Sequence, residues 1–322
     1  MRHLKLMVFI ITIILLISCG TTSMKMTLLR PAKINLSDYR QIAVDEIIGK
    51  IDEHTKDIAD QLADILVETG RFKVLDRQNL EKIMKEHQLD LSSPIDEATV
   101  PELGEIIGTA VVLFGRIQTD SYNETLSKGD PWIDNKGRTH QNNIRDGIYN
   151  LVLELKFVDI ETSKLISAET IIASEKLRTI VDSQRLPFVE KGVLYRKCLK
   201  KIMDKYTKLV APYEVKVEIS FETHKQLPEV DEAIALFKIG SWTRGLSILK
   251  KATMKPDLND KIRAKAYFDL GLAQMYNYKN KLAINSLQQA LKLHPKSKYE
   301  RALDTARKEA AKSEELKKQI DE

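Results

Sequence analysis

Residues 149–174 have the sequence YNLVLELKFVDIETSKLISAETIIAS, and this stretch decides the fold of the first half of the chain. Two apolar-rich runs, residues 149–160 and 164–174, each have the length and composition of a β-strand. The residues from Glu161 to Lys164 are polar and form a short connection between them. The sequence therefore predicts an antiparallel β-hairpin here.

Short strands and helices surround this hairpin. The other predicted strands are residues 42–47, 72–75, 109–117 and 213–223. The predicted helices are residues 54–70, a segment that Asp76 caps, residues 97–107, and residues 187–210. We therefore expect an α+β domain over residues 31–223, in which helices pack on a mixed sheet.

Two polar segments do not follow this pattern. Residues 118–147 are rich in turn-forming residues and poor in apolar ones, so they predict either a long loop or a ragged hairpin. Residues 19–30 form a polar leader, which we interpret as an anchor and linker that precedes the domain.

From Pro228 to the end, the apolar pattern is helical, and breaks near Gly240, Pro256, Asn277 and Pro295 separate the predicted helices. Two segments, ending at Ala252 and Ala290, resemble each other at an offset of 38 residues. The second has residues at the spacings of the tetratricopeptide repeat, namely Tyr267, Leu270, Gly271, Ala283, Leu287, Ala290 and Pro295.

The small residues Gly271, Ala283 and Ala290 allow two helices to cross closely, and Pro295 ends the pair. The first copy fits this pattern less well, and chance similarity between amphipathic helices is the alternative. We expect an all-α domain of two tetratricopeptide-like repeats at residues 228–295, followed by a capping helix and charged tail at 296–322. Such repeats form surfaces that bind peptides or proteins.

The first twenty residues predict a lipoprotein signal. Arg2 and Lys5 precede an apolar run from Leu6 to Ile17, which as a helix is roughly 18 Å long and too short for a hydrocarbon core of about 30 Å. This is the pattern of a secretory signal over residues 1–18. The run ends in LISC at residues 16–19, which resembles the lipobox of bacterial lipoproteins.

In that class a peptidase cleaves before the cysteine, whose thiol carries a diacylglycerol. We therefore expect lipid attachment at Cys19; a buried cysteine in an apolar helix is the alternative. Because Gly20 replaces the aspartate of an inner-membrane retention signal, the expected location is the outer membrane, with the protein facing the periplasm.

Composition limits the function classes. The formal net charge of +5 falls to +3 without Arg2 and Lys5, so a nucleic-acid partner is not expected. Removal of residues 1–18 leaves Cys19 and Cys198. Lipid attachment at Cys19 then leaves no pair for an intrachain disulfide. Cys198 is in helical phase with Leu194 and Ile202, which predicts a core residue.

The α+β domain resembles the periplasmic domain of the curli assembly and transport lipoproteins, the CsgG-like family, and of the related lipoproteins that activate penicillin-binding proteins. The segments that carry the resemblance are Asp76-Arg77, Glu86 and Gln88, Gly108, Gly115-Arg116-Ile117, and residues 158–162. The resemblance covers residues 28–212 and the lipobox. It implies a mixed sheet with packed helices.

In the curli channel each subunit also contributes two membrane hairpins, for which the segments here are residues 118–147 and 171–186. A membrane strand needs about 9–11 residues with an outward apolar row. Residues 118–147 lack such a row, and residues 171–186 offer one poor strand. We therefore expect this chain to keep the domain without the pore.

No residue set predicts catalysis, a metal site or a cofactor. The six histidines have no metal-ligand spacing, and Asp130, Asp134 and Asp146 lack the spacing of a calcium loop. We expect a non-enzymatic envelope lipoprotein that binds the membrane through Cys19 and binds proteins, with self-association open. The alternatives are a subunit of an oligomeric outer-membrane secretion channel and an activator of a penicillin-binding protein.

Overall fold

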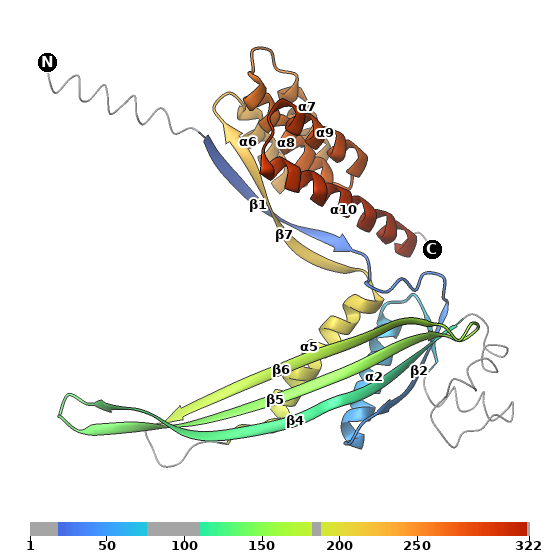
Figure 1. Ribbon diagram of the computed structural model, residues 1–322, viewed down its shortest axis with the longest axis vertical. Coiled ribbons are helices and arrows are strands. Elements are labelled where there is room, and N and C mark those ends of the chain that lie inside the picture. Colours follow the sequence, from blue (N-terminus) through green and yellow to red (C-terminus); the bar gives the residue numbers. More distant parts are fainter. Residues whose placement is uncertain (1–18, 76–109, 182–187, 321–322) are drawn as a thin grey trace. The chain divides into compact units, whose positions relative to one another are not determined.

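The computed structural model describes residues 19–75, 110–181 and 188–320. It divides into two compact units (Figure 1). Residues Ala32–Ala211 form the sheet unit. Residues 19–31 and Pro212–Glu322 form the helical unit. The predicted helices at Asp76 and at 97–107 lie outside the described residues.

The sheet unit contains a five-stranded mixed sheet with the strand order β3-β2-β4-β5-β6. Strand β2 is parallel to β3 and β4, whereas β4, β5 and β6 are antiparallel. The strands are β2 (Gln41–Ile48), β3 (Lys73–Leu75), β4 (Ala110–Ile133), β5 (Thr139–Asp159) and β6 (Leu165–Val181). The expected mixed sheet is confirmed, and so is the hairpin of residues 149–174.

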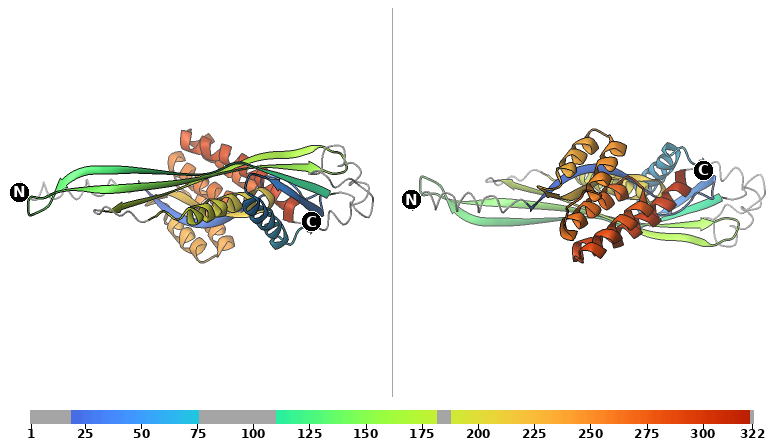
Figure 2. Two further views of the ribbon diagram at one scale, coloured as in Figure 1. Left: turned by 90° about the horizontal axis from the view of Figure 1, so that it is seen from below. Right: turned by 90° about the horizontal axis from the view of Figure 1, so that it is seen from above.

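Helices α2 (Asp52–Glu68) and α5 (Lys191–Val210) lie on one face of this sheet (Figure 1 and Figure 2). Leu153 and Phe157 of β5 are fully buried and share one core cluster with Leu62 of α2 and Ile202 of α5. Cys198 belongs to the same core, as its phase predicted, and its thiol donates to the Tyr149 carbonyl oxygen at 3.4 Å. Burial raises the pKa of this thiol, which makes it a poor nucleophile.

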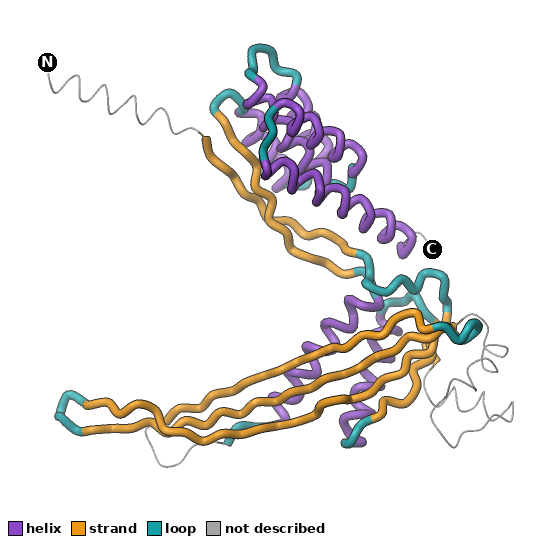
Figure 3. The backbone as a smooth tube through the Cα atoms, in the orientation of Figure 1, coloured by secondary structure: helices purple, strands orange, loops and turns teal. Residues whose placement is uncertain are grey.

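Residues 118–147 form a hairpin, the second of the two alternatives (Figure 3). Strands β4 and β5 continue through most of the segment and meet at a turn over residues 134–138, where Gly137 has a φ of 75°. Asp134 Oδ1 accepts the amides of Lys136 and Arg138 and closes this turn. Backbone pairing forms these strands although their side chains are mostly exposed, and the apolar pattern therefore did not indicate them.

The sequence predicted an anchor and linker over residues 19–30. They form β1 (Cys19–Arg30), which is antiparallel to β7 (Tyr213–His224) in a separate two-stranded sheet. Strand β7, which the sequence assigned to the first domain, groups with the helical unit. The buried side chains of Met24, Leu28, Ile219 and Phe221 account for this grouping, because three of them share a core cluster with the helices.

Five helices follow in the helical unit, with breaks where the sequence predicted them. They are α6 (Pro228–Lys238), α7 (Trp242–Thr253), α8 (Asp260–Tyr276), α9 (Asn280–Leu293) and α10 (Ser297–Ile320). Gly271 of α8 allows a close approach of α9, because a Cβ added there would lie 2.6 Å from Leu287 Cγ. Among the described residues, no helix combines the length and apolar character needed to cross a membrane.

Candidate functional site

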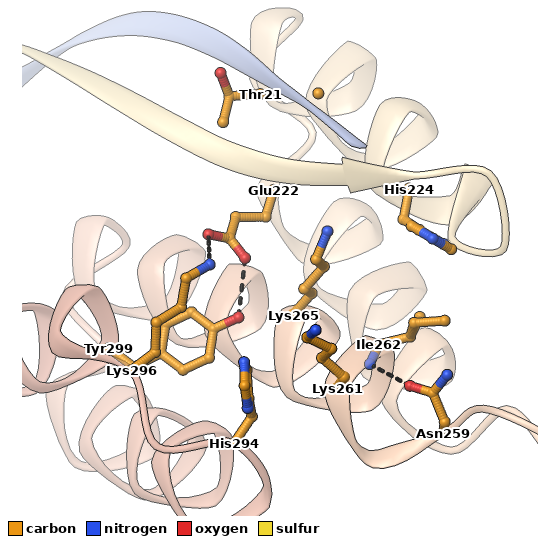
Figure 4. Close-up of a pocket in the computed structure, with 11 residues that line it drawn as sticks. Thr21, Glu222, His224, Asn259, Lys261, Ile262, Lys265, His294, Lys296 and Tyr299 are labelled. Carbon is orange, nitrogen blue, oxygen red and sulfur yellow. Dashed lines mark hydrogen bonds and ion pairs between the residues drawn. The ribbon is translucent and has the colours of Figure 1, made fainter. Parts of the chain in front are cut away.

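A pocket of about 470 Å³ opens in the helical unit between the end of the β1–β7 ribbon, the start of α8 and the α9–α10 turn (Figure 4). We call it the basic pocket. Its polar lining includes Glu222, His224, Lys261, Lys265, His294 and Lys296.

The ribbon register brings two of these side chains to the pocket. Glu222 lies opposite Thr21 and His224 lies opposite Cys19 in the antiparallel pairing. Because alternate residues of a strand share a face, Glu222 and His224 point to the same side. Gly20 and Thr21 also line the pocket, so it begins at the residue after Cys19.

Two helix N-termini open at the same place. Asn259 caps α8, and its side-chain oxygen accepts the Ile262 amide at 3.0 Å. Lys296 directly precedes α10, and its carbonyl oxygen accepts the Tyr299 amide at 2.9 Å. Unpaired amides at a helix N-terminus carry partial positive charge, which adds to that of the lysines.

Glu222 is 6% exposed and is held by three donors. Lys296 Nζ and Lys298 Nζ lie 2.8 and 3.2 Å from Oε1, and the Tyr299 hydroxyl donates to Oε2 at 2.9 Å. Burial alone would raise the pKa of Glu222, but the hydrogen bonds from Lys296, Tyr299 and Lys298 outweigh burial and hold its pKa below the ordinary value. Among the described residues, the one carboxylate that lines the pocket is therefore ionised and held by these three donors.

Asp269 lies beneath this carboxylate and is fully buried. Its Oδ1 accepts the Glu222 amide at 2.8 Å, and its Oδ2 has no hydrogen-bond partner in the described part of the chain. Desolvation raises the pKa of Asp269 well above the ordinary value. Burial thus disfavours the charged form of this carboxyl group.

His224 is uncharged near pH 7, because burial and the charge of Lys265 lower its pKa. Lysines outnumber ionised carboxylates in the lining. The basic pocket is therefore cationic without any contribution from the imidazoles.

Asp269→Asn is expected to change how stability depends on pH. A carboxyl whose pKa is higher in the folded state takes up a proton on folding, so the native chain loses stability as pH rises from the unfolded pKa toward the folded one. Asparagine does not titrate, so the variant should gain about 1.4 kcal/mol per pH unit relative to the parent above about pH 4, until the folded pKa is reached.

Urea unfolding followed by Trp242 fluorescence, in a Trp132→Phe background, measures this, since Trp242 stacks on Phe237 in the helical unit at 4.4 Å. The matched control is Asp304→Asn, whose side chain is 57% exposed. If the two variants show the same pH profile, Asp269 is ionised in the native chain.

A second polar cluster lies in the sheet unit, and no sequence pattern indicated it. Asp120 of β4 accepts the Tyr149 hydroxyl and lies 2.6 Å from His54 Nδ1 of α2. His54 stacks on Tyr195 of α5 with ring centroids 3.8 Å apart, and Tyr195 donates to Asp57 at 3.1 Å. Burial raises the pKa of both tyrosines, so both remain hydrogen-bond donors. We interpret this cluster as structural, because both oxygens of Asp120 are engaged.

The residues that the sequence singled out lie as follows. Leu270, Gly271, Ala283, Leu287 and Ala290 are buried where α8 packs on α9. Tyr267 is half-buried, and Pro295 is exposed before α10. Their assignment to tetratricopeptide repeats stays a prediction. Cys19 is the first residue of β1, and its lipid attachment also stays a prediction.

Two aspartates of the long hairpin are engaged by neighbours. The backbone amide of Arg138, followed by the side chains of His140 and Arg138, lowers the pKa of Asp134 to about 2. Hydrogen bonds and charge from Arg178 and Lys176 lower the pKa of Asp146 to about 2. No group of histidine, cysteine, aspartate or glutamate suited to a metal ion occurs in the described ranges.

Residues 35–188 match the family model described as the curli production assembly/transport component CsgG. No curated protein matches the chain.

Solved structures that resemble the chain include three bacterial proteins. Lipoprotein GNA1162 of Neisseria meningitidis is 14% identical with a TM-score of 0.30, and the match covers 52% of this chain and 96% of that one. The C-terminal domain of LpoB from Salmonella enterica is 11% identical with a TM-score of 0.29, covering 44% and 83%. PelC of Paraburkholderia phytofirmans, solved as a dodecamer, is 12% identical with a TM-score of 0.30, covering 58% and 99%.

Proposed function

We propose that this chain is a CsgG-like lipoprotein of the bacterial envelope that works without catalysis, by binding proteins in export or envelope assembly. The observation that carries the proposal is the match of residues 35–188 to the curli family model. The lipobox-like sequence that ends at Cys19 supports a lipid anchor, and Gly20 supports the outer membrane, with the protein in the periplasm.

The helical unit supports the protein-binding part of this proposal. We infer that α6 to α9 form two tetratricopeptide-type helix pairs with α10 as a cap. Small residues fit close helix crossings in both pairs: Gly245 packs against Phe237 and Gly271 against Leu287. Stacked pairs of this kind bury a shared core and leave an extended surface for a peptide or protein partner.

Cys19→Ala is expected to release nearly all of the protein from the membrane fraction after a salt wash. Acyl chains contribute about 0.8 kcal/mol per buried methylene, so losing them removes the main membrane attachment. The apolar run that remains is too short to span the bilayer. Membrane fractionation, combined with mass spectrometry of the N-terminal peptide, measures the effect.

Cys198→Ala is the matched control, because it removes the buried cysteine and leaves the anchor in place. It should stay in the membrane fraction. A parent protein that carries an unmodified Cys19 would contradict the anchor. Crosslinking in intact cells, with the anchored chain as bait, then identifies the partner, and capture of a penicillin-binding protein would favour the activator alternative.

One observation favours the secretion-channel alternative. Strands β4, β5 and β6 form a long antiparallel sheet with apolar side chains exposed on the face away from the helices, such as Ile172 (59% exposed) opposite Val152, and Ile180 (51% exposed) opposite Ile144. The size of the detergent-extracted protein separates the two candidates, because a channel requires a large ring and a monomer excludes it.

A further inference from the structure

We propose that the basic pocket binds the phosphate group of an anionic lipid headgroup beside the anchor. This inference rests on the proposed function, because the anchor at Cys19 decides which source of phosphate the pocket meets. The pocket itself is independent of the anchor.

Cationic groups from distant parts of the helical unit meet in this pocket. Lys261 and Lys265 come from the first turns of α8, and Lys296 comes from the turn before α10. Figure 4 shows Lys261, Lys265 and His294 directed toward the same space. Lys261 is exposed and can donate a charge-assisted hydrogen bond to a phosphate oxygen, while the positive charges of Lys265 and Lys296 add to the attraction for an anion.

The acidic groups nearby do not cancel this charge. Glu222 is held by Lys296, Lys298 and Tyr299 at one side of the pocket. Asp269 beneath it is fully buried, and burial raises its pKa well above the ordinary value. Because Glu222 is engaged and Asp269 does not line the pocket, the part of the pocket next to Lys261 remains attractive to an anion.

The N-termini of α8 and α10 lie at the same pocket, which Asn259 and Lys296 line. Both helices are long, with 17 and 24 residues, so each has a full helix dipole. A phosphate between lysines and helix N-termini meets the two features that bind anions most often in proteins.

The position of the pocket next to Cys19 favours a lipid headgroup over a soluble compound as the source of the phosphate. Gly20 and Thr21 line it, and His224 lies opposite Cys19 in the ribbon. Consecutive Cα atoms are about 3.8 Å apart, so the pocket begins within roughly 8 Å of an acylated Cys19 along the backbone. An anchored Cys19 lies at the membrane surface, where phosphate headgroups are the most abundant anions. A volume of about 470 Å³ accommodates such a group.

Lys261→Glu tests the proposal. Lys261 is exposed and is the second residue of α8, so its replacement should leave the fold intact. Lys281→Glu is the matched control, because Lys281 is the exposed second residue of α9 and does not line the pocket. Both variants carry the same change in net charge.

Two probes are used on the full chain. Glycerol 1-phosphate is titrated by calorimetry into protein held in an uncharged detergent. The thermal unfolding of the anchored protein is compared in nanodiscs of phosphatidylcholine with and without phosphatidylglycerol. We expect the parent and Lys281→Glu to bind glycerol 1-phosphate and to gain thermal stability from phosphatidylglycerol. Lys261→Glu should bind about tenfold more weakly and gain no such stability.

Each other outcome overturns part or all of the proposal. Glycerol phosphate binding without any effect of phosphatidylglycerol rejects the lipid and assigns the pocket to a soluble phosphate compound. Absence of glycerol phosphate binding in the parent rejects the site. An equal loss of affinity in Lys261→Glu and Lys281→Glu also rejects it. The calorimetric titration of Cys19→Ala separates this result from a failure of the anchor, because that chain retains the pocket and lacks the acylated thiol.

Discussion

Replacing Glu222 with alanine is expected to lower the free energy of unfolding of the helical unit by about 3 kcal/mol, because the variant leaves buried donors without their acceptor. The Tyr299 hydroxyl donates to Glu222 from a side chain that is fully buried, so it cannot turn to water. Lys296 and Lys298 are 41% and 33% exposed and recover part of their hydration, which keeps the loss below that of a completely buried ion pair.

Urea unfolding followed by Trp242 fluorescence in the Trp132→Phe background measures this loss. Glu218→Ala is the matched control, since Glu218 is an exposed glutamate on the same face of β7, and it should change stability by less than about 0.5 kcal/mol. Tyr299→Phe should cost about 1 kcal/mol, because it removes one of the three donors. An equal effect of Glu218→Ala and Glu222→Ala would show that this carboxylate does not hold the ribbon to the helices.

Local periodicity predicted the elements whose side chains alternate between core and solvent. The hairpin of residues 149–174 is an example: Leu151, Leu153 and Leu155 are fully buried at every second position. The helix predicted at 54–70 is α2, with Ile58 and Leu62 buried on one face. In these segments the polarity of each residue matches whether its side chain faces the core or solvent. The element can therefore be predicted without knowledge of distant contacts.

Strand β1 could not be predicted in this way. Its partner β7 lies almost two hundred residues later, and the polar residues from Thr21 to Ser23 resemble a linker. The pairing becomes clear only when Met24 and Leu28 are seen to be buried. The sequence analysis therefore placed the domain boundary after β7. In the structure, β1 and β7 both belong to the helical unit.

The basic pocket was missed for a related reason. Its lysines come from α8 and from the turn before α10, and each alone resembles an ordinary solvated residue on a helix. Only the register of the ribbon, which places Glu222 and His224 on one face, brings these segments together. The sequence signal available was the adjacency of Gly20 to the proposed anchor, which gives no indication of a binding site by itself.

A β-bulge in β4 explains why the sequence pattern did not indicate the polar cluster of the sheet unit. Ile117 lies opposite Leu153, but the register shifts between Ile117 and Thr119, so Asp120 comes to lie opposite Leu151. Leu153 and Leu151 are both buried on the inner face, and residues directly opposite share a face. The extra residue thus turns Asp120 inward, whereas strict alternation from Ile117 would have placed it outside.

Asp120→Ala is expected to lower the free energy of unfolding of the sheet unit by about 3 kcal/mol, because it leaves two donors of the core without an acceptor. The Tyr149 side chain is fully buried and the His54 side chain is 14% exposed, so water compensates little at either. Since His54 also stacks on Tyr195, the loss should loosen the contacts of α2 with α5 and with β5.

Hydrogen exchange measured by mass spectrometry resolves this effect by segment. Peptides from residues 52–68 and 149–159 should exchange faster in Asp120→Ala, whereas those from α8 and α9 should not change. Asp130→Ala is the matched control, because Asp130 is an exposed aspartate on the same strand. If these peptides exchange as slowly in Asp120→Ala as in Asp130→Ala, the Asp120 side chain does not contribute to the stability of the sheet unit. Faster exchange in Asp120→Ala alone would mean that the bulge in β4, by turning Asp120 inward, supplies a polar contact that fixes α2 to the sheet.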